Sequence, residues 1–201
     1  MTIKSILVTG GAGYIGSICV EKLVSEGYQV TVIDNLKTGH REAVSKDATF
    51  FHGDIGCPKN LNEVFKNCLP DAVLHFAGST LVSESIAKPL VYFKNNTING
   101  FTLLECAKSY GVRKFIFSST CATYGIPAQT PITESSPQIP INPYGESKLA
   151  FERMLLSQAM QSEMESVIFR YFNAAGATKK YGEFHNPETH LIPRLLQVAM
   201  G

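Results

Sequence analysis

The sequence lacks several features that mark particular classes of protein. It carries no block of like charges, and its net charge is +1 over 201 residues. A nucleic acid or a charged membrane surface is therefore not expected as its main partner. No apolar run approaches the roughly 18 residues that a membrane-spanning helix needs. The N-terminal stretch "MTIKSILVTGG" does not have the pattern of a secretory signal.

Cysteine is scarce, and its spacing carries no recognisable chemistry. The five cysteines are Cys19, Cys57, Cys68, Cys106 and Cys121. They are odd in number and widely spaced, and no CxxC pair is present, so neither a zinc site, redox chemistry nor a disulfide framework is indicated. We expect reduced thiols in a cytoplasmic protein and no bound metal.

Short apolar runs alternate along the chain with longer amphipathic ones, and no internal repeat interrupts the alternation. The strand-like runs cover residues 5–10, 28–34, 49–55, 71–78, 113–120 and 166–173, and the helical ones residues 14–26, 61–68, 101–110, 144–160 and 191–201. Near-continuous apolar strands separated by helices predict an α/β fold, a doubly wound parallel sheet of the Rossmann-like type.

A glycine-rich loop follows the first predicted strand and opens the first predicted helix. In "VTGGAGYIG", Gly11, Gly13 and Gly16 fit GxGxxG, and Gly10, Gly13 and Gly16 fit the related GxxGxxG spacing. Such a loop turns tightly, lets the backbone approach a pyrophosphate and faces its charge with a helix N-terminus. Asp34 ends the second strand, where a carboxylate accepts hydrogen bonds from a ribose diol and repels a 2′-phosphate. The pattern favours NAD over NADP; the alternative is a plain glycine turn with a surface aspartate.

Three further segments fall at the carboxyl ends of predicted strands, where ligands bind in such sheets. They are Asp54-Ile55, Phe76-Ala77-Gly78 and Ser118-Ser119-Thr120. We expect the first to border the adenine, the second to pass beneath the pyrophosphate, and the third to present hydroxyls near the reacting atoms. Each segment taken alone is also compatible with ordinary strand-end chemistry.

A tyrosine and a lysine lie one helical turn apart in "NPYGESK". Asn142 is a suitable cap and Pro143 a suitable first residue for a helix that carries Tyr144 and Lys148 on one face. A free phenol has a pKa of about 10, and a nearby ammonium or a positive nicotinamide ring favours its ionised form. The spacing therefore predicts Tyr144 as a proton acceptor with a lowered pKa, Lys148 as its partner and a contact to the nicotinamide ribose, and Thr120 as a hydrogen-bond donor to the same substrate oxygen. The alternative is a solvated pair on an exposed helix.

Together these motifs resemble the extended short-chain dehydrogenase/reductase family, and within it the nucleotide-sugar 4-epimerases. The resemblance runs from about Lys4 to the last residue and includes "VTGGAGYIGS", "VIDNLKTGH", "HFAG", "FIFSSTCATYG", "NPYGESK" and "RYFNAAGA". It implies an NAD-dependent enzyme that interconverts UDP-glucose and UDP-galactose through a 4-keto sugar. It also implies a UDP-hexose as substrate and a homodimer built through a helix pair, residues 94–110 and the helix of Tyr144.

The resemblance adds residues to the predicted site. For the cofactor it adds Tyr14, Ile15, Asn35, Leu36, Thr38, Gly39, Asn95 and Phe172; for the UDP-sugar it adds Asn173, His190 and Leu191. Two positions depart from the family pattern. Ser79-Thr80-Leu81 follows "FAG" where some members have a lysine, and His190 stands where some members have asparagine. Asn173 as a strand cap and His190 as an exposed loop residue remain the alternatives.

The resemblance also implies that residues 1–174 form an NAD-binding domain and that residues 175–201 begin a substrate-binding lobe. Family members are longer, so we expect this chain to be a fragment that is inactive alone. Other functions stay open on the same scaffold. A 4,6-dehydratase would need an acid pair beside Thr120, where this chain has Cys121-Ala122. An epimerase of UDP-N-acetylglucosamine or UDP-glucuronate is not excluded by any of these residues. A non-catalytic NAD sensor would have no use for the set of Thr120, Tyr144 and Lys148.

Overall fold

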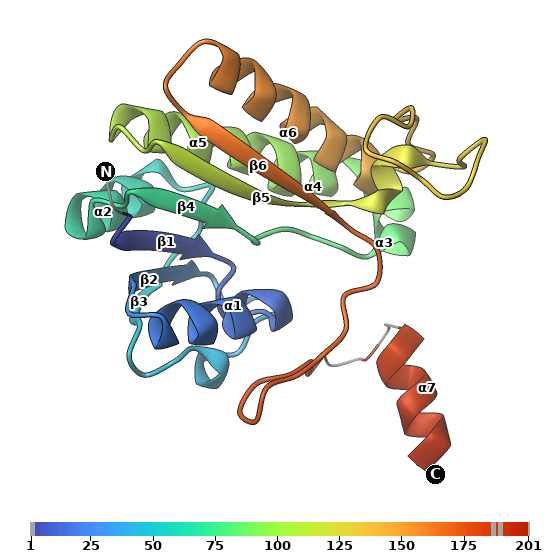
Figure 1. The fold of residues 1–201 in the computed structure, drawn as a ribbon, viewed down its shortest axis with the longest axis horizontal. Coiled ribbons are helices and arrows are strands. Elements are labelled where there is room, and N and C mark those ends of the chain that lie inside the picture. Colours follow the sequence, from blue (N-terminus) through green and yellow to red (C-terminus); the bar gives the residue numbers. More distant parts are fainter. Residues whose placement is uncertain (1–2, 186–187, 189–190, 201) are drawn as a thin grey trace.

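The computed structural model describes residues 3–185, 188 and 191–200, and its centre is one sheet of six parallel strands (Figure 1). The strands are β1 (Ser5–Thr9), β2 (Gln29–Asp34), β3 (Thr49–His52), β4 (Ala72–His75), β5 (Lys114–Thr120) and β6 (Glu165–Tyr171). Their order in the sheet is β3-β2-β1-β4-β5-β6, with every neighbouring pair parallel. Strands β2 and β3 follow β1 toward one edge of the sheet, whereas β4, β5 and β6 follow one another toward the opposite edge. The strand order therefore reverses between β1 and β4, as in doubly wound dinucleotide-binding folds. The predicted fold class is confirmed.

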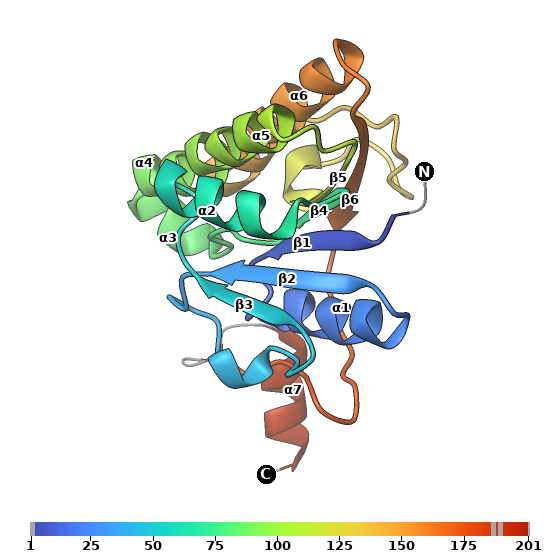
Figure 2. The same ribbon diagram turned by 90° about the vertical axis from the view of Figure 1, so that its left-hand side faces the viewer.

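Helices cover the two faces of the sheet unequally (Figure 2). The helices are α1 (Tyr14–Ser25), α2 (Pro58–Cys68), α3 (Val82–Ala87), α4 (Pro89–Tyr92), α5 (Asn99–Ser109), α6 (Pro143–Met160) and α7 (Leu191–Met200). A π-helix, Phe93–Ile98, joins α4 to α5, and short 3-10 helices occupy Arg41–Ala43 and Cys121–Tyr124. Helices α2, α5 and α6 lie on one face and α1 on the other.

Successive side chains of a strand point to opposite faces of the sheet, so the sheet has one hydrophobic core on each face. Leu7 of β1 and Phe117 of β5 face α2, α5 and α6, where they pack against helix residues such as Phe151. The sequence neighbours of Leu7, such as Val8, point the other way and pack in a second cluster with Val20 of α1. A strand that is buried on both faces reads as a continuous apolar run, and this is the pattern the sequence shows.

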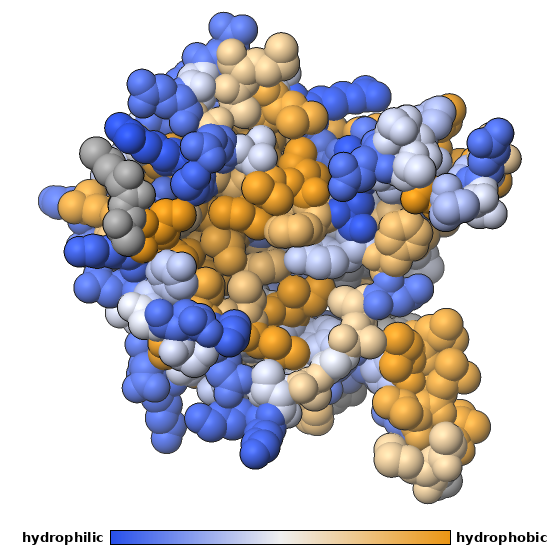
Figure 3. All heavy atoms as spheres, in the orientation of Figure 1, coloured by the Kyte–Doolittle hydropathy of each residue, from blue (hydrophilic) through white to orange (hydrophobic). Residues whose placement is uncertain are grey.

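Among the described residues, no helix covers one part of the sheet. On β6, Val167 and Phe169 are each 48% exposed, on the face where α1 covers only the other end of the sheet. Figure 3 shows apolar atoms gathered over this region and along α7, whose described residues are exposed or half-buried. No helix in the described part of the chain is long and apolar enough to cross a membrane.

The structure departs from the sequence prediction at several element boundaries. β3 and β4 end at His52 and His75, earlier than residues 55 and 78, because the chain leaves the sheet there to form loops over its edge. Helices α3 and α4 were not predicted, since "VSESIAKPLVY" has no clean helical period and contains a proline. Residues 94–98 were expected only as the start of a helix over residues 94–110 and form a π-helix instead.

Candidate active site

The glycine loop between β1 and α1 contains glycines of two kinds. Gly10 has a left-handed φ of 72° and lies so close to β4 that a Cβ there would stand 2.5 Å from the Ala77 nitrogen. A Cβ on Gly16 would collide with the Gly10 carbonyl. A Cβ on Gly13 would meet only that same carbonyl, at an ordinary 3.4 Å. The fold therefore requires Gly10 and Gly16, whereas Gly13 leaves open space at the N-terminus of α1, where a phosphate would approach.

Asp34 ties the end of β2 to this loop. One carboxylate oxygen accepts a hydrogen bond from the Ala12 nitrogen at 3.0 Å, and the other accepts one from the Leu36 nitrogen at 2.9 Å. Leu36 itself has a φ of 56°, a strained conformation that this turn holds in place. Each carboxylate oxygen keeps a second lone pair, so Asp34 still has acceptors for a ribose diol.

The edge formed by β2 and β3 is built around Asn35 and Asp54. The Asn35 side-chain nitrogen donates to Asp54 at 2.8 Å, and the other Asp54 oxygen accepts from the Gly56 nitrogen at 2.7 Å. Ile55 is buried in the core on the α2 side, so its side chain does not face this edge. A Cβ on Gly39 would overlap the Ala12 backbone, which places this residue against the glycine loop. Of the other residues expected near the adenosine and the loop, Thr38 is exposed and Ile15 half-buried.

The segment after β6 returns to the same edge. The Tyr14 hydroxyl donates to the Gly176 carbonyl at 2.6 Å. The His40 Nε2 lies 3.0 Å from the Phe184 carbonyl, and the two rings meet edge to face at 5.4 Å. Residues 176–184 therefore contact both sides of the glycine loop.

At the carboxyl end of β4, Gly78 lies beside two buried polar side chains. A Cβ on Gly78 would come within 3.1 Å of both the Asn96 amide oxygen and the Lys148 nitrogen. The Asn96 side chain holds both backbone groups of Ser79 and also donates to Ser147 at 3.0 Å. Asn95, the residue expected at the cofactor, is half-buried next to it and donates to the Ser79 hydroxyl. Sequence analysis missed Asn96, because "KNN" carries no sign of which asparagine turns inward on a π-helix.

Lys148 and Tyr144 meet the carboxyl end of β5 from α6. The helix is capped by Asn142, whose side-chain oxygen accepts from the Gly145 nitrogen at 2.8 Å. Lys148 is buried and donates to the Ser118 carbonyl at 2.9 Å. Two residues further along the strand, the Thr120 side chain hydrogen-bonds Tyr144 and lowers the pKa of the phenol. The predicted set of Thr120, Tyr144 and Lys148 thus lies together at one strand end and is not a solvated pair.

The electrostatics of this set differ from the prediction in one respect. Burial raises the pKa of Tyr144 above its usual value; the hydrogen bond from Thr120 lowers it, and nearby Cys121 raises it. Burial also lowers the pKa of Lys148 to about 8, while the charge of Glu152 acts to raise it. The expected lowering of the Tyr144 pKa by Lys148 is absent from the chain on its own, because the ammonium points to the Ser118 carbonyl and desolvation dominates.

A buried histidine lies behind the lysine. His75, the last residue of β4, pairs with the Thr9 hydroxyl at 2.7 Å and stacks on Phe117 at 5.5 Å. Burial, and then the charge of Lys148, lowers its pKa to about 3, so it is neutral. Its Nε2 has no hydrogen-bond partner among the described residues.

The residues expected at the sugar are not gathered in the same way. Asn173 follows β6 and is exposed, as is its neighbour Phe172, which was expected at the cofactor, and Leu191 is exposed at the start of α7. His190 lies outside the described residues. The geometry thus comprises a glycine loop, an acidic residue after β2 and a Thr-Tyr-Lys set on one edge of a doubly wound sheet. A model of the NAD dependent epimerase/dehydratase family matches residues 6–200.

The chain belongs to that family. Its curated relatives include a UDP-glucose 4-epimerase of Halalkalibacterium halodurans, which is 52% identical over 199 residues that cover 98% of this chain and 59% of that protein. A crystal structure of UDP-glucose 4-epimerase from Brucella ovis in complex with NAD is similar, with a TM-score of 0.94 and 45% identity, covering 98% of this chain and 61% of the other.

The UDP-Glc/GlcNAc 4-epimerase from Campylobacter jejuni is also similar in structure, with a TM-score of 0.85 and 40% identity over 98% of this chain and 61% of the other. The chain therefore spans about three fifths of the length of the family members it matches.

Proposed function

We propose that this protein is an NAD-dependent 4-epimerase that interconverts UDP-glucose and UDP-galactose. The observation that carries the proposal is the assembly of Thr120, Tyr144 and Lys148 at the carboxyl end of β5, on the edge that also carries the glycine loop. Membership of the NAD dependent epimerase/dehydratase family and the names of its relatives support it.

The chain fits a dinucleotide along this edge. The open space at Gly13 and the free amides of the first turn of α1 suit a pyrophosphate, while Asp34 suits a ribose diol. Asn35 and Asp54 lie where the adenine end would be held, and Gly78, Asn95 and Lys148 where the nicotinamide ribose would be held. We propose NAD rather than NADP, because a 2′-phosphate would meet the Asp34 carboxylate.

The mechanism assigns each catalytic group a task. When bound, NAD would supply the hydride chemistry at C4 of the sugar, as acceptor from the alcohol and as donor to the opposite face of the ketone. Tyr144, as phenolate, accepts the proton of the 4-hydroxyl and later gives it back to the same oxygen. Thr120 donates a hydrogen bond that holds this oxygen beside the phenol. Lys148, as ammonium, favours the phenolate, which matters because burial alone raises the pKa of Tyr144.

A second substrate class shares the same catalytic set. A structural relative is named for both UDP-Glc and GlcNAc, so an N-acetylated UDP-sugar is the second candidate. The test is an assay of the full-length gene product with UDP-galactose and, separately, with UDP-N-acetylgalactosamine. Turnover of the first alone supports the proposal, turnover of both broadens it, and turnover of neither by protein that contains NAD contradicts it.

We further propose the organisation of the whole protein. Residues 1–174 form the NAD-binding domain, and residues 175–200 begin the part that closes over the sugar, with Asn173 and Leu191 contributing to it. The protein is proposed as a cytoplasmic homodimer; the five free cysteines suit a reducing compartment. The surface proposed for the dimer is a groove between α5 and α6 that Phe101 and Met154 line.

A further inference from the structure

A buried glutamate lies one helical turn beyond the lysine of the site. Tyr144, Lys148 and Glu152 are spaced four residues apart on α6, and Glu152 is fully buried. A carboxylate away from water is costly unless donors surround it. The mechanism proposed above gives Glu152 no task, so its place beside the catalytic pair needs an explanation.

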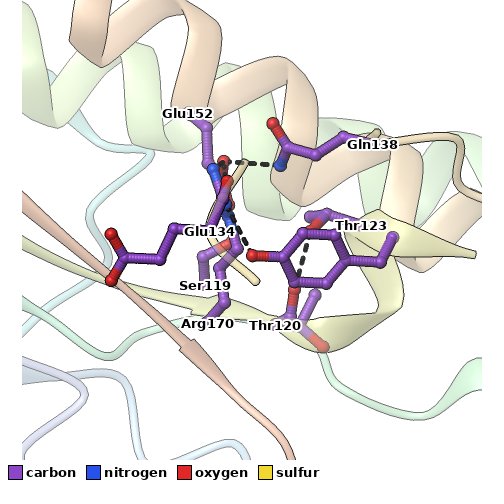
Figure 4. A network of polar contacts seen from close by, with 8 residues as sticks. Ser119, Thr120, Thr123, Glu134, Gln138, Glu152 and Arg170 are labelled. Atoms are coloured by element: carbon purple, nitrogen blue, oxygen red, sulfur yellow. Dashed lines mark hydrogen bonds and ion pairs between the residues drawn. The ribbon is translucent and has the colours of Figure 1, made fainter. Parts of the chain in front are cut away.

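Donors from three other parts of the chain surround this carboxylate (Figure 4). Arg170 of β6 donates through Nε at 3.2 Å and through Nη2 at 2.9 Å, and the Gln138 side chain donates at 2.9 Å. The Ser119 hydroxyl of β5 donates to the other oxygen. The second arm of Arg170 donates to the Tyr124 hydroxyl at 2.8 Å. Glu152 therefore links α6, β5, β6 and the loop before α6.

Three successive residues of β5 are joined to these three residues of α6. Ser118 accepts from Lys148 through its carbonyl, Ser119 donates to Glu152, and Thr120 hydrogen-bonds Tyr144. Ser119 also stands opposite Arg170 in the pairing of β5 with β6. The Ser119–Glu152 contact lies between the Ser118–Lys148 contact and the Thr120–Tyr144 contact. It therefore fixes the spacing of these two contacts along the strand.

Glu152 is also the anion that acts on Lys148. The groups around the ammonium are the Ser118 carbonyl, the Phe117 ring at 4.9 Å and neutral His75, and Gly78 lies between the ammonium and the Asn96 amide oxygen. Burial lowers the pKa of Lys148, and the charge of Glu152 is what counters this effect. Arg170 holds Glu152 in place through an ion pair at 2.9 Å.

We infer that Glu152 is a positioning residue of the proposed epimerase site, supplying the counter-charge of the buried Lys148 ammonium and, through Ser119, fixing the strand end that carries Thr120. The inference rests on the proposed function for its catalytic consequence only. The competing explanation is a purely structural clamp between α6 and β6.

The test compares the full-length protein with Glu152→Gln and Glu152→Asp. Activity with UDP-galactose is followed against pH, and the titration of Lys148 is followed by NMR of ε-¹³C-labelled lysine, assigned with Lys148→Arg. In Glu152→Gln we expect the loss of activity at high pH and the Lys148 titration to move together, to lower pH by roughly one unit. Glu152→Asp keeps the charge and leaves both near their wild-type positions, with a lower kcat. The matched control is Glu146→Gln, an exposed carboxylate on the same helix, which moves neither.

Two results overturn the inference. One is a Glu152→Gln protein that folds and titrates Lys148 as wild type does, whatever its activity; the other is an equal shift in Glu146→Gln. If wild type has no epimerase activity, the proposed function fails and the NMR titration still decides the charge of Lys148. If Glu152→Gln does not fold, Ser119→Ala decides: we expect a kcat at least tenfold lower with an unmoved high-pH limit, and an unchanged kcat refutes the positioning role.

Discussion

Tyr144 is a phenol whose protein surroundings oppose its ionisation. Burial is the largest influence and raises its pKa, and the hydrogen bond from Thr120 offsets only part of this. In the proposed mechanism, proton transfer at neutral pH therefore depends on positive charge from Lys148 and from bound cofactor. We expect Tyr144 to be un-ionised in the empty site and to act as a base only once the dinucleotide is bound.

Replacing Tyr144 by phenylalanine tests this role. We expect Tyr144→Phe to lower kcat by about 10²–10⁴-fold, because a positioned acid–base group contributes that much, while the NAD content of the purified protein stays at the wild-type level. Turnover of UDP-galactose and the absorbance of released cofactor measure the two. The control is Tyr110→Phe, whose hydroxyl contacts Asn62 far from the site. Near-normal turnover of Tyr144→Phe would exclude it as the base.

The burial of protonated Lys148 lowers the free energy of unfolding. Its pKa is about 8 in the folded chain, against 10.5 without burial, so the folded state holds the proton less tightly than the unfolded state. Below about pH 8 both states are protonated and the cost is fully present. Between about pH 8 and pH 10.5 the unfolded state still holds a proton that the folded state has released, so wild-type stability rises with pH in that window.

Lys148→Met should therefore be inactive but more stable. The two pKa values correspond to roughly 3 kcal/mol, from which the lost hydrogen bond to Ser118 subtracts about 1 kcal/mol, so we expect a gain of about 2 kcal/mol at pH 7. Urea unfolding of cofactor-free protein at about pH 7 and about pH 10 measures it, and the gain should shrink at the higher pH. Lys108→Met, at an exposed lysine, is the control. A variant less stable than wild type at pH 7 contradicts the argument.

At the scale of elements, the β1–loop–α1 unit separates folding from binding. Gly16→Ala places a methyl group against the Gly10 carbonyl, and overpacking of this kind costs about 1–3 kcal/mol. Gly13→Ala meets only ordinary contacts at a φ of −83°, which alanine accepts. We expect Gly13→Ala to unfold within about 1 kcal/mol of wild type yet to bind NAD at least tenfold more weakly.

Urea unfolding and isothermal titration with NAD distinguish the two variants. The expected pattern is opposite: lost stability for Gly16→Ala, and lost affinity at nearly unchanged stability for Gly13→Ala. Equal NAD affinity of Gly13→Ala and wild type would contradict the proposal that the pyrophosphate binds at this loop.

The strands and the main helices were predictable, because their local patterns agree with the final fold. Each of the six strands is a compact apolar run. The start of α6 is indicated by Asn142, a good cap, and by Pro143 in the first turn. The gathering of Thr120, Tyr144 and Lys148 was predictable for the same reason, since the carboxyl ends of parallel strands meet at one edge. The predicted strand ends were too long at β3 and β4, where apolar residues such as Phe76 continue past the hydrogen-bonded ladder.

The other features of the site could not be predicted from the sequence, because they depend on contacts between distant segments or on burial. Asn96 turns inward because a π-helix rotates it toward Ser79 and Ser147, and no local pattern specifies that turn. The bonds of Glu152 to Ser119 and Arg170 join three elements that are far apart in sequence. The raised pKa of Tyr144 follows from burial, which a helical spacing of four residues does not reveal.

At the scale of the whole molecule, apolar side chains on α5 and α6 face outward. Phe101 is 42% exposed in the groove between the two helices. If this groove is the surface of the proposed homodimer, a charge there must be desolvated on association. We expect Phe101→Glu to weaken self-association at least tenfold and to leave a monomer that retains NAD.

Sedimentation of the full-length protein over a range of concentrations measures this. Ile126→Glu serves as the control, since Ile126 is exposed in the loop after β5, outside that groove. A Phe101→Glu protein that remains as dimeric as wild type would move the interface elsewhere.

The bonds of Asp34 to Ala12 and Leu36 carry a consequence for how this protein can change over evolutionary time. The side chain proposed to discriminate against a 2′-phosphate also fastens the glycine loop to the turn after β2. A first mutation of Asp34 toward NADP binding would therefore also remove these two bonds and weaken the binding site for either cofactor. A library built to swap cofactor preference would need compensating changes near Ala12 and Leu36 before substitutions of Asp34 could succeed.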